Sequence, residues 1–208
     1  TMSNNTAAFQ GGAVYVSSGT GASLEIHDST FTNNQVTGTQ AWSAIGGAVF
    51  SYVGAEITGS TFRSNKRFGT GGAVYIASGN LDVSDCIFDQ NSAVKQGGAI
   101  QLPIHTEPIM ITDTSFTNNT VGNAETPGLG GAICRAMQEE YPSFRPETLS
   151  LINTTFENNR AVGGRGGALF LGGALSVQDS QFNGNISDTN GGALYLFQGK
   201  SDIQHSTF

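Results

Sequence analysis

The side chains that could do chemistry are few and widely spaced in this sequence. There are two cysteines, Cys86 and Cys134, and three histidines, His27, His105 and His205. No group of His, Cys and Asp residues has the spacing of metal ligands. The two cysteines occupy different slots of the repeat described below, and a disulfide requires Cα atoms within about 7 Å. We therefore expect two free thiols and no metal centre of the zinc type.

Four aspartates recur at one position, three residues before a phenylalanine: Asp28, Asp85, Asp113 and Asp179. An aspartate at a turn commonly accepts hydrogen bonds from backbone amides. A row of carboxylates could instead bind calcium, which prefers oxygen ligands. We expect no cofactor, and calcium along this row is the alternative that stays open.

Two short motifs alternate through the whole chain and define a repeat. Gly-Gly-Ala begins at Gly11, Gly46, Gly71, Gly97, Gly130, Gly166 and Gly191. Phe-x-x-Asn occurs as Phe31/Asn34, Phe62/Asn65, Phe88/Asn91, Phe116/Asn119, Phe156/Asn159 and Phe182/Asn185. The shortest spacing is about 26 residues, in the range that is typical of solenoids.

Between these motifs, apolar residues alternate with polar ones in short runs separated by Gly, Asn and Ser. This alternation predicts strands, and the 29 glycines fit many tight turns. The sequence thus predicts an all-β protein, a single right-handed parallel β-helix of about seven to eight coils with two or three short strands each. Stacked coils would bring the Phe and Asn of each motif into inward ladders.

Departures from the shortest repeat predict surface loops at 35–45, 120–129 and 134–148 of one repeat domain that covers 1–208. The chain begins and ends inside a repeat, and we expect it to be a fragment of a longer protein. A stripe of aromatic residues follows the Gly-Gly-Ala motif in the slot that alternation places outside: Tyr15, Phe50, Tyr75, Phe170 and Tyr195. Gln101 and Cys134 interrupt the stripe. We interpret it either as a covered sheet face or as a contact surface for a protein or glycan.

The paired Gly-Gly-Ala-(Ile/Leu/Val) and Phe-x-x-Asn repeats resemble those of the chlamydial polymorphic outer membrane proteins. The resemblance covers the whole chain. It implies the β-helical passenger of an autotransporter, displayed at the outer membrane and acting in adhesion. It also implies that the two tetrapeptides are linked to adhesion. The residues themselves favour a structural role, because the Phe and Asn of each motif are expected to face inward.

We expect a non-enzymatic extracellular or cell-surface domain that acts in adhesion or structural assembly. Its partner would be a protein or glycan on a neighbouring cell or in an extracellular assembly. The alternative is a carbohydrate-active β-helix enzyme, a polysaccharide lyase or hydrolase. Such enzymes need converging carboxylates or a carboxylate with Lys or Arg, and no repeat carries such a pair on one strand face.

The formal charge of −7 argues against nucleic acid as a partner, and no apolar run is long enough to span a membrane. Asn4, Asn118 and Asn153 begin Asn-x-Ser/Thr sequons and are candidate glycosylation sites if the source glycosylates secreted proteins.

Overall fold

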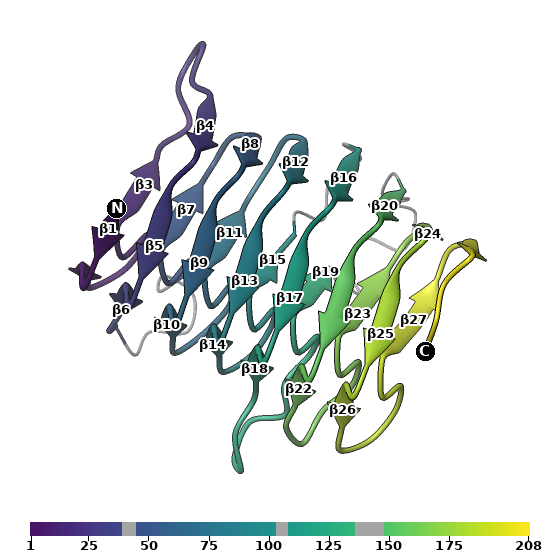
Figure 1. The fold of residues 1–208 in the computed structure, drawn as a ribbon. Helices are drawn as coiled ribbons and strands as arrows, with labels where there is room; N and C mark the ends of the chain where they lie inside the picture. Colours follow the sequence, from purple (N-terminus) through teal and green to yellow (C-terminus); the bar gives the residue numbers. More distant parts are fainter. Residues whose placement is uncertain (39–44, 103–107, 136–147) are drawn as a thin grey trace.

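The structure, a computed structural model, describes residues 1–38, 45–102, 108–135 and 148–208. Every regular element in these ranges is a strand, and the strands form four seven-stranded sheets. All strand pairs are parallel, and each strand pairs with its own copy in the next coil, as for Phe62, Phe88 and Phe116. Figure 1 shows the resulting stack of coils. The predicted all-β parallel β-helix is confirmed.

Each coil contributes one strand to each sheet, in chain order. The first sheet contains β1 (Met2–Ser3), β5 (Thr30–Thr32), β9 (Thr61–Arg63), β13 (Ile87–Asp89), β17 (Ser115–Thr117), β21 (Thr155–Glu157) and β25 (Gln181–Asn183). The second contains β2 (Thr6–Ala7), β6 (Gln35–Val36), β10 (Lys66–Arg67), β14 (Ser92–Ala93), β18 (Thr120–Val121), β22 (Arg160–Ala161) and β26 (Ile186–Ser187).

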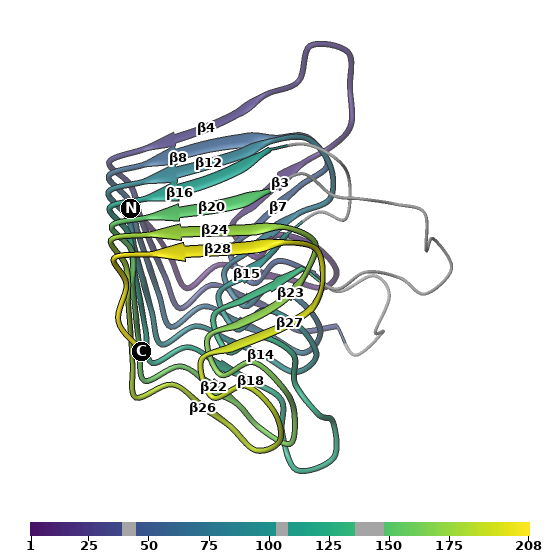
Figure 2. The same ribbon diagram turned by 90° about the vertical axis from the view of Figure 1, so that its right-hand side faces the viewer.

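The third sheet contains β3 (Val14–Val16), β7 (Val49–Ser51), β11 (Val74–Ile76), β15 (Ile100–Gln101), β19 (Ile133–Arg135), β23 (Leu169–Gly172) and β27 (Leu194–Gln198). The fourth contains β4 (Leu24–His27), β8 (Ala55–Thr58), β12 (Leu81–Ser84), β16 (Ile109–Thr112), β20 (Leu149–Ile152), β24 (Leu175–Gln178) and β28 (Ser201–Gln204). In Figure 2 the fourth sheet lies at the top, the third on the right and the second at the bottom.

Two details of the predicted coil are corrected by this arrangement. A coil has four strands rather than two or three, because the residues between Phe-x-x-Asn and Gly-Gly-Ala form the short strands of the second sheet. From the first to the seventh strand of a sheet the chain completes about six turns, slightly fewer than the seven to eight coils predicted.

Left-handed backbone conformations produce the corners of each coil. One corner is the first glycine of Gly-Gly-Ala, for example Gly71 with φ 70° and Gly97 with φ 60°. The other two are mostly non-glycine residues, with φ between 45° and 59°. One of these precedes the phenylalanine by three residues and the other lies just before the ladder asparagine, as in Asp85 and Gln90 around Phe88. Asn, Asp and Gly tolerate this conformation better than most residues, which explains their recurrence at these two positions.

The second glycine of the pair has a different role. A Cβ on Gly98 would lie against the carbonyl oxygen of Gly131 in the next coil and against the backbone of Thr120 in the second sheet. The two coil walls approach so closely here that only glycine fits. The third residue, such as Ala99 or Ala132, is fully buried and begins the main core.

Candidate functional site

The Phe-x-x-Asn motif forms two continuous ladders inside the solenoid. Adjacent phenylalanine rings stack face to face, with centroids 4.8 Å apart for Phe62 and Phe88 and 4.9 Å for Phe88 and Phe116. The ladder members with less than 3% of their surface exposed are Phe31, Phe62, Phe88, Phe116, Phe156 and Phe182. In the first coil Met2 occupies the same slot, in register with Phe31.

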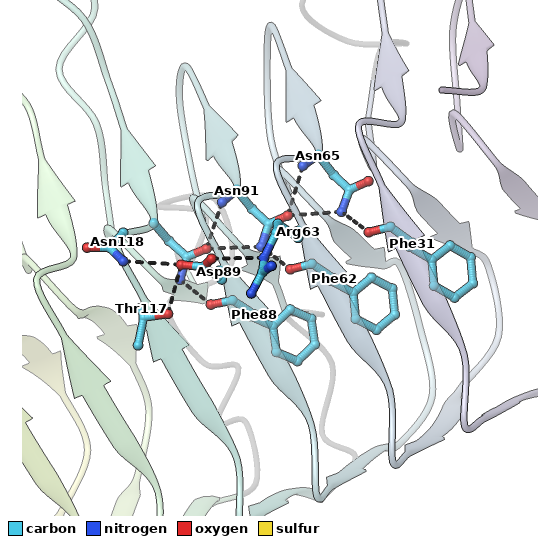
Figure 3. A network of polar contacts seen from close by, with 10 residues as sticks. Phe31, Phe62, Arg63, Asn65, Phe88, Asp89, Asn91, Thr117 and Asn118 are labelled. Atoms are coloured by element: carbon cyan, nitrogen blue, oxygen red, sulfur yellow. Dashed lines mark hydrogen bonds and ion pairs between the residues drawn. The ribbon is translucent and has the colours of Figure 1, made fainter. Parts of the chain in front are cut away.

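The asparagines bond the coils in both directions. Asn91 accepts hydrogen bonds from the backbone N–H and the side-chain Nδ2 of Asn65, both at 3.0 Å. Its own Nδ2 donates to the carbonyl oxygen of Phe62 at 2.9 Å and to Oδ1 of Asn119 at 3.0 Å (Figure 3). The same pattern repeats at Asn34, Asn65, Asn119, Asn159 and, for the bond back to the phenylalanine, Asn185. The motif therefore links the Phe of one coil to the Asn of the next.

A third ladder uses the small residue two positions before each phenylalanine. The backbone N–H of Ser60 donates to Sγ of Cys86 at 3.4 Å, and that of Cys86 donates to Oγ1 of Thr114 at 3.2 Å. Cys86 also donates to the carbonyl of Ser84 at 3.1 Å, as the hydroxyls do in other coils. Burial raises the pKa of Cys86 to about 11. The thiol thus replaces a hydroxyl in a structural role.

The aromatic stripe is only partly on the surface. Tyr15 is 50% exposed, whereas Phe50 is fully buried and Phe170 is 7% exposed. Tyr75 and Tyr195 are half-buried. The predicted exposure is therefore wrong for Phe50 and Phe170, because further aromatic rings cover them. Tyr52 contacts Phe50 edge-on at 4.8 Å, and Phe197, which a bulge inserts into β27, lies 5.3 Å from Phe170.

The stripe is nevertheless a stacked structure that divides into two groups. Tyr15, Phe50 and Tyr75 stack at 5.5 and 5.4 Å, and Phe170 stacks on Tyr195 at 5.0 Å. Gln101 and Cys134 lie between the groups, and both are buried, although alternation predicts surface positions for them. Burial, with Tyr52 and Cys134 as smaller causes, raises the pKa of Tyr75. Most of the 134–148 insertion, predicted above as a surface loop, lies outside the described residues.

A polar network on the outer face of the first sheet was not predicted from the sequence (Figure 3). Nε of Arg63 lies 3.0 Å from Oδ2 of Asp89, and Oδ1 accepts hydrogen bonds from Thr117 at 3.0 Å and Asn118 at 3.1 Å. The two charged residues belong to different repeats and are 26 positions apart in the sequence. Arg63 and Asp89 occupy the same slot of adjacent coils, so that only the register of the stack brings them together.

The candidate glycosylation sites Asn4, Asn118 and Asn153 all lie in left-handed corners. Two have their amide nitrogens engaged: Asn118 donates to Asp89, and Asn153 donates to Asp113 at 2.6 Å. In this fold, a glycan on either nitrogen would replace that hydrogen bond. Modification of the three sequons stays a prediction.

The row of Asp28, Asp85, Asp113 and Asp179 lies along one edge of the solenoid in left-handed backbone conformation. Asn153 fills the slot between Asp113 and Asp179, and its amide bonds one of these carboxylates. Within the described ranges, no three His, Cys, Asp or Glu side chains are grouped so as to hold a metal ion. Both cysteines are buried and no disulfide joins them, and His105 lies outside the described residues.

Two arginines lie in slots that point inward and that are apolar or small in other coils. Arg135 is fully buried and pairs with Leu171 of the next coil, in the same slot of the third sheet. It donates from Nε to the carbonyl of Gly172 at 3.2 Å and from Nη2 to that of Ala174 at 3.3 Å. Arg67 is 4% exposed in the slot of Val36. Burial lowers the pKa of each guanidinium to about 10.

Comparison with known proteins identifies the repeat. The family model of the Chlamydia polymorphic membrane protein repeat matches residues 1–17, 85–103, 113–134, 153–172 and 179–196. The probable autotransporter YfaL of Escherichia coli (strain K12) is 30% identical over an alignment of 222 residues, which covers 96% of this chain and 17% of the relative. The chain thus spans about a sixth of that relative's length. No solved structure matches this chain. The chain is therefore a parallel β-helix whose repeats are similar to the Chlamydia polymorphic membrane protein repeat and to part of a probable autotransporter.

Proposed function

We propose that this chain is a contact-making part of a surface-displayed, autotransporter-type passenger that acts in adhesion or assembly. A surface-associated, non-enzymatic role fits its family of repeats and its autotransporter relative. The single observation that carries the proposal is the burial of both repeat motifs. The Phe, the Asn and the Gly-Gly-Ala triplet hold the coils together, so that recognition is left to positions that differ from coil to coil.

The variable position that best fits contact with a partner is the edge of the third sheet around Tyr15 and Tyr52. Their rings are 50% and 39% exposed and meet nearly at right angles, with centroids 6.3 Å apart. Phe50 lies buried beneath both rings and holds them in place. Exposed aromatic side chains that are held rigidly lose little conformational entropy on binding, which makes them frequent hot spots in interfaces.

Catalysis has less support in the described residues. Asp89 is the buried acidic side chain there, and its oxygens are occupied by Arg63, Thr117 and Asn118. Both oxygens of this carboxylate are thus already bonded within the protein, whereas a glycosidase acid must reach the oxygen of the leaving group. The described part of the chain also has no helix with the length and apolar character needed to cross a membrane.

The proposal can be tested by measuring how the purified chain binds to cultured animal cells and to itself. We expect the double change Tyr15→Ser and Tyr52→Ser to abolish binding while the unfolding transition is kept. Met110→Ser is the matched control, because Met110 is similarly exposed, at 46%, but lies on the fourth sheet. Equal binding by the double variant and the parent chain would refute a contact role for these tyrosines.

A further inference from the structure

Arg67 has the burial of a core residue without the partners that a buried cation requires. Its Nε and Nη1 atoms are sealed from solvent, and neither has a hydrogen-bond partner in the structure. None of the ion pairs formed among the described residues includes it. A buried charge left unpaired is strongly destabilising in general, so a residue of this kind needs a compensating interaction.

Arg135 shows what compensation looks like in the same fold. It is more deeply buried, yet its guanidinium bonds the carbonyls of Gly172 and Ala174. Arg67 replaces residues that are much smaller in the neighbouring coils: Val36 precedes it, and Ala93 follows in the same slot of β14. Small apolar side chains thus occupy this slot in the neighbouring coils, so the fold itself does not require a cation at this position.

The strand that carries Arg67 meets the next coil in an irregular register. Lys66 pairs with Ser92, and the pairing resumes only at Thr70 and Gln96. Beyond Arg67, Phe68 is 58% exposed. The carbonyl of Gly69 accepts hydrogen bonds from the backbone N–H groups of both Val94, at 3.1 Å, and Lys95, at 2.8 Å. Short segments with few ladder bonds open at low cost, which would give a ligand access to the guanidinium.

We infer that Arg67 anchors a binding site for an oxyanion group, a carboxylate or sulfate that the planar guanidinium holds with two parallel hydrogen bonds. The oxyanion is either a free ion or a group on an acidic glycan. This inference is independent of the proposed contact at Tyr15 and Tyr52, which lies on another sheet.

The test is thermal unfolding of the whole chain in sodium sulfate and in sodium chloride of equal ionic strength. The parent chain, Arg67→Met and Arg135→Met are compared. We expect sulfate at ten times its dissociation constant to raise the Tm of the parent chain and of Arg135→Met by about 3–6 °C relative to chloride. Arg67→Met should lose this increment. Sulfate also stabilises proteins non-specifically, and that part of the increment should remain in all three proteins. Arg135→Met is the control for the loss of a buried arginine.

If Arg67→Met shows the same increment as the parent chain, sulfate is an adventitious ion only and the inference is wrong. If Arg67→Met does not fold, Arg67→Lys keeps the charge without the planar fork and should bind sulfate about tenfold more weakly by calorimetry. Unchanged affinity in Arg67→Lys would equally overturn the site. Binding of dextran sulfate, with neutral dextran as control, separates the two sources. Loss of that binding in Arg67→Met indicates a glycan, and its retention alongside a lost sulfate increment indicates the free ion.

Discussion

The first and third sheets belong to the same coils but use the repeat differently. In the first sheet, six coils place a phenylalanine in one inward slot, and the rings stack in almost parallel planes. In the third sheet, the outward slot holds Tyr15, Phe50, Tyr75, Gln101 and Cys134 in successive coils. The first sheet is the uniform wall of the solenoid, and its repeated side chains stabilise the stack. The third sheet is the variable wall, and its differing side chains can form a specific surface. The difference indicates where substitutions should affect stability and where they should affect binding.

The largest effect should come from the uniform wall. Phe88→Ala removes a ring that stacks on both neighbours, and we expect a loss of about 3–5 kcal/mol in the free energy of unfolding. Urea unfolding measures this loss. Ile87→Ala on the same strand is the control, since Ile87 is 43% exposed and should cost below about 1 kcal/mol. Equal losses at the two positions would contradict the inward assignment of the phenylalanines.

The same wall should also carry a pH dependence. The pKa of Cys86 is raised from 9.0 to about 11 by burial, so above pH 9 the unfolded chain loses this proton while the folded chain keeps it. Stability from this group is thus fully present below pH 9 and is lost as pH rises toward 11, by roughly 2–3 kcal/mol. Unfolding of the parent chain and Cys86→Ser between pH 8 and 11 isolates the contribution. Parallel stability curves would show that Cys86 does not titrate in this way.

The glycine pair lies where the chain entering the third sheet approaches the second sheet. Gly98→Ala would place a methyl group against the backbone of Gly131 and Thr120, and overpacking of this kind costs about 1–3 kcal/mol. Gly19→Ala is a suitable control, because no atom lies within 4 Å of a Cβ built there. The midpoint of urea unfolding reports both changes. A Gly98→Ala protein as stable as Gly19→Ala would mean that the coils can move apart at this corner.

The Asp89 network should have a smaller effect, because it lies on the outside of the first sheet. Asp89→Asn keeps the shape but removes the charge that Arg63 faces, and half of the Arg63 side chain is exposed. We expect a loss of about 1–2 kcal/mol that shrinks in high salt. Comparing Asp89→Asn with Arg63→Met and the double variant separates the pair from its neighbours. Additive losses would show that the ion pair itself contributes nothing.

The repetitive features could be predicted from the sequence, and the singular ones could not. Phe88 and Asn91 recur in register, so their alternation alone places them inside stacked coils. Arg67 and Arg135 each occur once in a slot that is otherwise apolar or small, and a period conveys nothing about a single exception. The prediction that Phe50 is exposed is wrong for a related reason. Alternation distinguishes the two faces of a strand but cannot show that Tyr52 covers the outer one. The contact between Arg63 and Asp89 depends on register between repeats, which reading each repeat alone misses.

The smallest loss of stability should come from the tyrosines at the edge of the variable wall. Tyr15 and Tyr52 pack against Phe50 but keep 50% and 39% of their surface exposed, so the double change to Ser should cost only about 1–2 kcal/mol. Phe50→Ala, in the same cluster, should cost about 3–5 kcal/mol because that ring is fully buried. Both proteins can be compared by urea unfolding and by cell binding on the same preparations. A contact surface predicts that the tyrosine variant loses binding with its fold intact. If the tyrosine variant unfolds as readily as Phe50→Ala, these rings belong to the core, and the variable wall stabilises the solenoid just as the uniform one does.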